Sequence, residues 1–203
     1  MSQAPTEYQR LFPDSIQLET PRVILRLMKK EDAAEFNKIA KNADVWKWFT
    51  KDLSDEKEME QWIEDALKER EEGKRMPFTV IDRETKRICG CSSLGNISLF
   101  DRRVEIGWTW LGPEFIGTGL NRHAKFALLC YAFDVMKVER VEIKTDNLNE
   151  RAKAALVKIG AKPEGVLRSH MQMHSNRRRD TIYYSILKDE WEVVKNSRFS
   201  EMV

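Results

Sequence analysis

The feature that most constrains this chain lies between residues 104 and 135, where an apolar run breaks at glycines and then resumes. The first part, VEIGWTWL, is apolar except for one carboxylate, Glu105, and is typical of a strand. Gly112-Pro113 ends this run, and the segment IGTGLN then opens into a long apolar stretch typical of a helix. We therefore predict a strand, a tight glycine turn and a helix in this order.

This predicted turn has the properties of a phosphate-binding loop. The first N–H groups of a helix have no partner inside the helix, and the helix dipole is positive at that end. Glycines have no Cβ, so an anion can approach those N–H groups closely. Two familiar phosphate loops do not fit, because no Lys-Ser/Thr pair follows the last glycine and Arg122 occupies the place of a third glycine.

Length and composition indicate one domain with an ordinary core. With 203 residues we expect an extended arm over residues 1–17, a domain over residues 18–188 and a polar tail over residues 189–203. The net charge of +2 does not favour nucleic acid or a membrane surface as a partner. Residues 126–133 form the longest apolar run, far short of a span of about 20 residues. Three cysteines and no recognisable signal segment fit the cytoplasm.

Local signals predict further elements. Asp55 with Glu58 resembles a capping box at the start of a helix whose charged tail ends at Gly73, and residues 78–94 are typical of a β-hairpin. Asn149 is a good N-cap for a helix that ends at Gly160.

Several smaller patterns leave alternatives open. Trp46 and Trp48 could line a substrate cleft or cap the core. Cys89 and Cys91 share a face of a predicted strand without further soft ligands, so we expect core thiols and no metal site. The same spacing argument, about 13 Å along a strand, separates His170 from His174. Residues 177–179 are all arginine, and a solvated hairpin tip is favoured over a grip on an anion.

Three segments together resemble a known family. They are TPRVILR, EIGWTWLGPEFIGTGLNRHAKFALLCYAF and NLNERAKAALVKIGAKPEGVLR, and with the predicted order of elements they resemble the GNAT N-acetyltransferase superfamily over about residues 16–188. The resemblance is strongest to the ribosomal-protein N-terminal alanine acetyltransferase branch, RimJ/RimL. It implies an α/β (α+β) fold with a mixed, mostly antiparallel sheet of six to seven strands, flanked by about four helices.

The resemblance also implies acetyl-CoA as the acetyl donor and assigns residues to it. The backbone of Ile116, Gly117, Thr118, Gly119, Leu120 and Asn121 would hold the pyrophosphate, although the family usually has Ala or Gly where Asn121 stands. Asn149 matches a family asparagine that contacts the pantetheine arm. Two positions depart from the family pattern: Ala152 replaces a frequent serine, and Leu156 replaces a tyrosine that protonates the departing thiolate in many members.

Glu105 is the candidate general base. A primary amine is mostly ammonium at neutral pH, and a positioned carboxylate can take its proton before it attacks a thioester. Many family members carry a glutamate base on this strand, and partial burial would raise the pKa of the side chain. The alternative is an outward-pointing Glu105 paired with Arg103 or Arg140. We expect a backbone N–H near Trp108 to Trp110 to hold the oxyanion.

The function predicted from the sequence is acetyl transfer from acetyl-CoA to a primary amine, either a protein N-terminus or a small molecule. One alternative is a CoA-binding regulatory module without turnover, favoured by Leu156 and Ala152. Another is a ribosome- or RNA-associated protein that uses residues 177–179. The resemblance implies homodimers as well, for which the sequence shows no interface.

Overall fold

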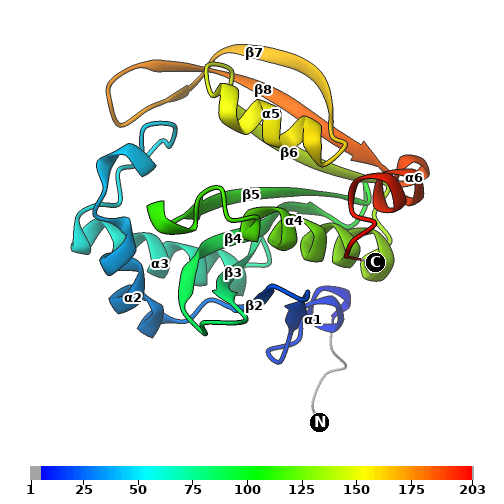
Figure 1. Ribbon diagram of the computed structural model, residues 1–203, viewed down its shortest axis with the longest axis horizontal. Coiled ribbons are helices and arrows are strands. Elements are labelled where there is room, and N and C mark those ends of the chain that lie inside the picture. The colour runs from blue at the N-terminus through cyan, green and yellow to red at the C-terminus, as the bar shows by residue number, and fades with distance from the viewer. Residues whose placement is uncertain (1–5, 203) are drawn as a thin grey trace.

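The computed structural model describes residues 6–202, which are organised around one eight-stranded sheet (Figure 1). The strand order is β1-β2-β3-β4-β5-β6-β8-β7, and every neighbouring pair is antiparallel except β5 and β6, which are parallel. The strands are β1 (Gln17–Glu19), β2 (Val23–Leu27), β3 (Arg75–Asp82), β4 (Ile88–Ser98), β5 (Arg103–Leu111), β6 (Arg140–Asp146), β7 (Lys162–Gln172) and β8 (Arg178–Leu187). The predicted mixed, mostly antiparallel α/β fold is confirmed, with eight strands rather than six to seven.

The helices pack on both faces of this sheet. The α-helices within residues 6–202 are α1 (Glu7–Leu11), α2 (Ala33–Ala40), α3 (Glu56–Glu71), α4 (Leu120–Cys130), α5 (Glu150–Lys158) and α6 (Lys188–Arg198). Neighbouring residues of a strand point to opposite faces. Because the ring of Trp110 contacts Phe36 of α2 while Thr109 bonds to Lys125 of α4, these two helices cover opposite faces of β5.

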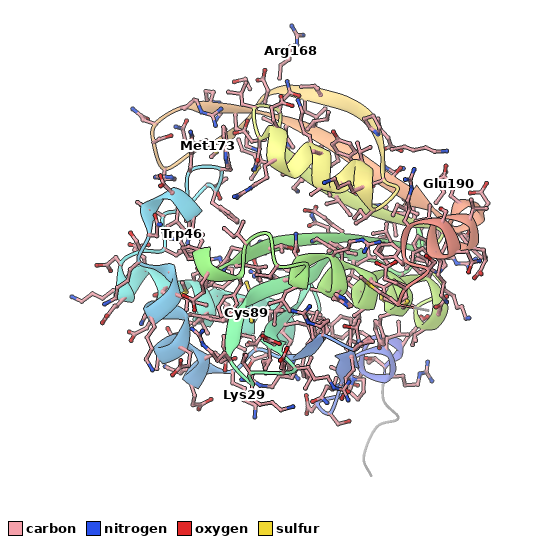
Figure 2. All side chains as sticks on the ribbon, in the orientation of Figure 1. Lys29, Trp46, Cys89, Arg168, Met173 and Glu190 are labelled. Atoms are coloured by element: carbon pink, nitrogen blue, oxygen red, sulfur yellow. The ribbon has the colours of Figure 1, made fainter. Side chains whose placement is uncertain are left out.

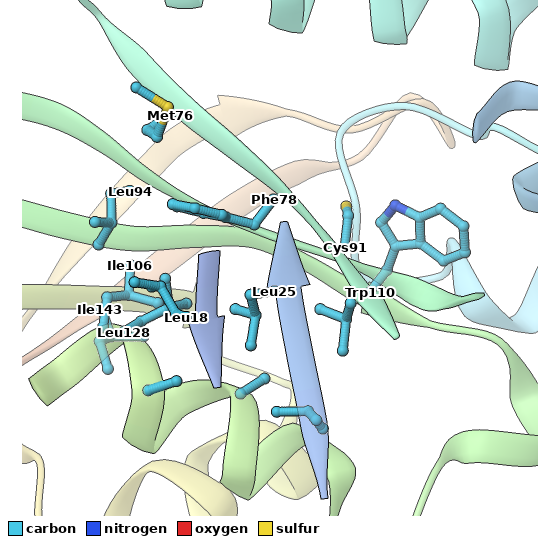
Figure 3. Close-up of a cluster of buried hydrophobic side chains, with 14 of the residues drawn as sticks. Leu18, Leu25, Met76, Phe78, Cys91, Leu94, Ile106, Trp110, Leu128 and Ile143 are labelled. Atoms are coloured by element: carbon cyan, nitrogen blue, oxygen red, sulfur yellow. The ribbon is translucent and has the colours of Figure 1, made fainter. Parts of the chain in front are cut away.

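A continuous apolar core lies between the sheet and α4. Figure 3 shows Leu25, Phe78, Leu94 and Ile106 from four neighbouring strands beside Leu128 of α4, all fully buried. In β2 buried and half-buried residues alternate, as expected when one face of a strand packs against a core. Burying each such side chain contributes roughly 1.5–3 kcal/mol, so this face of the sheet contributes substantially to the stability of the fold.

The local predictions in the first half of the chain are confirmed. The helix α3 begins after Asp55, whose side chain accepts hydrogen bonds from the N–H groups of Lys57 and Glu58, and it ends before Gly73 at a φ of +72°. The predicted hairpin is the pair β3–β4, and Cys89 and Cys91 are buried in the core. No helix among residues 6–202 has the length and apolarity needed to span a bilayer.

The arm expected over residues 1–17 is not extended where the structure describes it. Residues 6–17 contain α1, which Thr6 caps, and then a turn that buries Phe12 and Ile16. Residues 1–5 lie outside the described part of the chain. The segment has few apolar residues, and those few are the ones that dock, so hydrophobic periodicity did not reveal the helix.

The polar tail expected over residues 189–203 is also folded up to residue 202. It forms α6, whose Trp191 ring stacks on Phe133 with centroids 5.1 Å apart and donates from Nε1 to Asp134. Only Trp191 and Val194 are buried in this helix. Three apolar residues in a helix of eleven, of which two are buried, are too sparse to predict packing from the sequence.

Candidate active site

Strands β5 and β6 diverge soon after they meet. Their parallel pairing covers only residues 103–105 of β5 and 140–142 of β6, although β5 continues to Leu111 and β6 to Asp146. In Figure 1 the layer with β5 and α4 separates from the layer with β6, β8 and α5. The candidate site is built where the two strands part, because each then exposes backbone edges that its neighbour no longer pairs.

Glu105 is the last β5 residue that pairs with β6, so it stands at the point of divergence. Its side chain is buried, and Oε2 accepts hydrogen bonds from Asn96 Nδ2 at 2.7 Å and from Lys144 Nζ at 2.8 Å. No described residue donates a hydrogen bond to Oε1. This oxygen lies against the Cα of Gly107, where an added Cβ would come within 2.8 Å of it. The carboxylate therefore keeps one oxygen able to accept a proton.

The outward orientation considered for Glu105 is wrong. Arg103 pairs with Asp101 and Glu142, and Arg140 pairs with Glu142 and Glu164. The partner of Glu105 is Lys144, which comes from the same side of the neighbouring strand β6. Strand alternation alone could not tell which lysine or arginine would reach Glu105, because the choice depends on the register of two strands distant in sequence.

The glycine loop after β5 has the backbone geometry of an anion cradle. Gly117 and Gly119 have φ values of +83° and +90°, which favour glycine, and a Cβ at either position would meet nothing within 4 Å. The N–H groups of Gly117, Thr118 and Gly119 donate to no acceptor within residues 6–202. The loop thus presents free N–H groups with open space in front of them.

The first turn of α4 continues this cradle. Gly119 is the N-cap and provides no side-chain cap, and the N–H of Asn121 has no acceptor among the described residues. The Asn121 Oδ1 atom is buried and also lacks a hydrogen-bond partner in that part of the chain. Unmet polar groups at the positive end of a helix suit an anionic ligand with further polar atoms, so the residues fit the pyrophosphate of CoA. Ile116 and Leu120 flank the loop, the first 37% exposed and the second buried.

Trp108 and Trp110 contribute to the site through their backbone alone. Trp108 has a φ of +51° where the β4–β5 register shifts, which is a β-bulge, and its ring packs over the Cα of Gly95 and over Arg75. The Trp110 ring packs edge-on against Phe36 in the core. A bulge leaves backbone groups of the extra residue out of the ladder, and the oxyanion contact near Trp108 to Trp110 stays a prediction.

Asn149 caps α5, as its sequence context predicted. Its Oδ1 accepts from the N–H of Ala152 at 3.1 Å, and the residue is buried. Leu156 is buried on the same helix, at the position where the resembled family has its acid. The capping role of Asn149 is thus shown, and its contact with a cofactor stays a prediction.

The arginine run at residues 177–179 is not the solvated tip that we favoured. Arg177 pairs with the buried carboxylate of Asp146, and Arg179 is 8% exposed. Only Arg178 is exposed, and it bonds to Ser169 on β7. Because neighbouring side chains of an extended segment point to opposite faces of the sheet, Arg177 and Arg179 lie on the face of Asp146 and Arg178 lies on the other.

The open question about the tryptophans is answered for Trp46, which is fully buried in the core. Its ring packs against Trp110 with centroids 5.1 Å apart, and its Nε1 donates to the carbonyl of Ala40. Trp48 is half-buried beside Lys47. Trp46 therefore packs in the core against Trp110 of β5, and its ring does not line a substrate cleft.

Sequence reasoning missed one buried cation beside the site. Lys125 of α4 is 6% exposed, and its Nζ donates to Thr109 Oγ1 at 2.7 Å. Burial lowers the pKa of Lys125 to about 7, against the opposing attraction of Glu105 and Cys91. A signal existed, since Lys125 follows Asn121 by four residues and interrupts a helix that is apolar on most sides.

A buried carboxylate at a strand divergence, next to a glycine-opened helix whose first N–H groups have no acceptor among residues 6–202, is a candidate site for a ligand with an anionic end. The chain matches the family described as acetyltransferase (GNAT) domain over residues 22–162. The protein therefore belongs to the GNAT acetyltransferase family, and the resemblance drawn from the sequence is confirmed.

Individual relatives agree with this assignment. "Uncharacterized N-acetyltransferase p20" of Bacillus licheniformis is 30% identical over 179 residues, which cover 86% of this chain and 97% of that protein. "Putative ribosomal N-acetyltransferase YdaF" of Bacillus subtilis is 37% identical over 105 residues, so the match spans 52% of this chain and 56% of that relative. The structure of a GCN5-related N-acetyltransferase from Brucella melitensis superposes with a TM-score of 0.84 and 26% identity, covering 93% of this chain and 86% of that one.

Proposed function

We propose that this protein transfers the acetyl group of acetyl-CoA to a primary amine by direct attack, with Glu105 as the general base. The observation that carries the proposal is the position of Glu105: it is buried at the divergence of β5 and β6, with Oε1 free and the N–H groups of the glycine loop farther along the same chain segment. Acetyl-CoA supplies an acyl thioester. The residues of this chain bind acetyl-CoA, orient the acceptor amine and remove its proton.

In this proposal the cofactor is held by its anionic end. The N–H groups of residues 117–121 bind the pyrophosphate, and Asn149 lies near the pantetheine arm. This arrangement points the thioester toward the bulge at Trp108 on β5. A backbone N–H between Trp108 and Trp110 then stabilises the negative charge that develops on the carbonyl oxygen.

Glu105 takes the proton of the attacking ammonium group, directly or through one water. Lys144 and Asn96 hold Oε2 and so fix the carboxylate in one orientation, which leaves Oε1 to face the amine. With Leu156 at the position of the family acid, the thiolate leaves without a proton from that helix. The modest basicity of a thiolate permits this departure.

The test compares Glu105→Gln with a matched control, Glu142→Gln, which removes the carboxylate paired in register on β6. Thiol release from acetyl-CoA is followed with a panel of amines, and CoA affinity is measured by calorimetry. We expect Glu105→Gln to bind CoA normally and to lose about 10²–10⁴-fold in turnover. Glu142→Gln should keep both properties. Unchanged turnover in Glu105→Gln at every pH would remove Glu105 from the mechanism.

A CoA-binding module without turnover is the second candidate, and the buried Leu156 at the acid position favours it. Calorimetric binding of CoA without thiol release for any amine would support this candidate. The RNA-associated alternative has lost its main feature, because Arg177 is engaged by Asp146 and Arg179 is buried.

The acceptor proposed from the family is a protein N-terminus or a small-molecule amine. The name of the relative YdaF refers to a ribosomal N-acetyltransferase, which supports testing peptide N-termini. The homodimer stays a prediction. Strand β7 forms one end of the sheet and exposes Val166 and Leu167, two apolar residues that a second copy of the chain can cover. Analytical ultracentrifugation of the wild type tests the homodimer.

A further inference from the structure

Arg179 is a buried cation without a hydrogen-bond partner. The residue is 8% exposed, its Nε is buried and unpartnered, and no hydrogen bond or ion pair joins its guanidinium to any residue between 6 and 202. Burial lowers the pKa of Arg179, although an arginine keeps its charge in a folded protein. A buried charge without hydrogen bonds is costly, so a ligand that supplies the missing acceptor would be bound favourably.

The carboxylates nearest to Arg179 already have other partners. Asp146 and Glu105 both attract its charge. However, Asp146 accepts from Arg177, and Glu105 accepts from Lys144 at 2.8 Å. Each of these pairs is neutral as a unit, so the charge of Arg179 is left over. On the face of β6 and β8 that carries Asp146 and Thr181, Arg179 is therefore a cation that no described carboxylate pairs.

Thr181 adds a second unsatisfied group on the same face. It follows Arg179 by two residues on β8, and side chains two apart on a strand point to the same side. Thr181 is fully buried, and its Oγ1 has no partner in the described chain. It pairs in register with Asp146 of β6. A guanidinium and a hydroxyl thus face the same space, and both can donate to one acceptor.

The turn between β7 and β8 contacts the segment that follows α2. His174 Nε2 lies 3.1 Å from the carbonyl oxygen of Trp46, and Met173 is 2% exposed. Figure 2 shows Met173 above Trp46, at the end where the two layers are otherwise separated. Arg179 itself is only 8% exposed, and the low local dielectric of a buried site strengthens the attraction of a cation for an anion.

We propose that Arg179 and Thr181 form an anion subsite for the amine acceptor, which carries a carboxylate in addition to its amine. The inference rests on the proposed acetyl transfer, because it places the amine at Glu105 and the carboxylate on β8. One guanidinium offers two parallel donors that match a carboxylate, and one uncompensated charge matches a single negative charge. The carboxylate can come from a free amino acid or from an acidic side chain of a peptide.

The test uses acceptors that differ only in this charge. Thiol release from acetyl-CoA is measured for glycine, β-alanine and γ-aminobutyrate and for the corresponding primary amides. We expect kcat/KM to favour the acid of the best length by about 10- to 100-fold, the effect of a hydrogen-bonded charge. Arg179→Gln should reduce the ratio of acid to amide to about one, whereas Arg178→Gln, which changes the exposed neighbour, should preserve it. Thr181→Val should lower the ratio by a few fold.

A second arm separates the two sources of the carboxylate. The peptides Ala-Asp-Ala-amide and Ala-Asn-Ala-amide are compared in the same way, so a preference confined to the peptides identifies a protein N-terminus followed by an acidic residue. A preference confined to the free acids identifies a small molecule. Equal rates for acids and amides in both arms, in the wild type, overturn the subsite while acetyl transfer stands.

Direct binding distinguishes a failed subsite from a failed function. Calorimetry with β-alanine and with the aspartyl peptide is run on the wild type and the variants, in the presence of CoA. Binding that Arg179→Gln abolishes, without thiol release for any amine, supports the subsite and refutes acetyl transfer. Absence of both binding and preference overturns the subsite. If Arg179→Gln does not fold, the ratio of acid to amide in the wild type and in Thr181→Val decides whether the subsite exists.

Discussion

The buried Lys125 predicts an unusual dependence of stability on pH. Burial lowers its pKa from 10.5 in the unfolded chain to about 7 in the folded protein. Below pH 7 the folded and the unfolded chain both hold the Lys125 proton, so the folded state carries the full cost of burying this charge. For a pKa shift of this size the cost is about 5 kcal/mol. Above pH 7 the folded protein has released the proton that the unfolded chain still binds. The free energy of unfolding therefore rises with pH.

The expected rise between pH 7 and pH 9 is about 2 kcal/mol, slightly less than the limit of about 1.4 kcal/mol per pH unit. The window should end there because buried thiols act in the opposite direction. Burial raises the pKa of Cys89 from 9.0 to about 11 and the pKa of Cys91 from 9.0 to about 12. Above pH 9.0 the unfolded chain therefore releases thiol protons that the folded protein keeps. That difference lowers the stability as pH rises further.

The assay is urea unfolding at several pH values for the wild type, Lys125→Met and Lys158→Met. Methionine keeps most of the side-chain length of Lys125 and removes its charge, so Lys125→Met should show a flat profile and exceed the wild type in stability at pH 7. This advantage should shrink by about 2 kcal/mol at pH 9. Lys158 is exposed on α5, and its substitution should keep the wild-type slope. Equal slopes in Lys125→Met and the wild type would refute the reasoning.

Two further predictions concern glycines. Gly119→Ala places a methyl group at a φ of +90° in front of the loop, where no described atom lies within 4 Å. We expect a loss of about 1–2 kcal/mol in urea unfolding and an affinity for CoA at least about tenfold lower by calorimetry. Normal CoA binding would contradict the anion cradle. Gly90→Ala would bring its Cβ within 2.1 Å of the Trp110 carbonyl oxygen, so we expect a loss of about 4 kcal/mol or more. A melting temperature equal to that of the wild type would exclude this close approach of β4 and β5.

Sequence and structure agree most closely where the signal is local. The strand with Glu105, the glycine turn and helix α4 follow one another within about thirty residues, so periodicity and turn chemistry suffice to predict them. The cap at Asn149 and the glycine that ends α5 depend only on neighbouring backbone groups, and both were predicted.

The terminal helices show the limit of such patterns. Helix α6 docks through Trp191 and Val194, and its other residues are mostly polar or exposed. Its position depends on Phe133 and Asp134, which lie more than fifty residues earlier in the chain. A helix that needs so few apolar contacts cannot be told from a polar tail until its docking surface exists.

The sequence by itself determined the loop that suits a diphosphate and the strand that carries the candidate base, because each depends on the spacing of residues close in the chain. The fold class followed from the resemblance of three segments to a known family. Only the tertiary structure decided the surroundings of that base. The register of β5 against β6 brings Lys144 to Glu105, and the register of β8 turns Arg179 inward, where its guanidinium has no partner among residues 6–202. Pairing between distant strands sets these contacts, and a shift of one residue would turn every side chain to the other face.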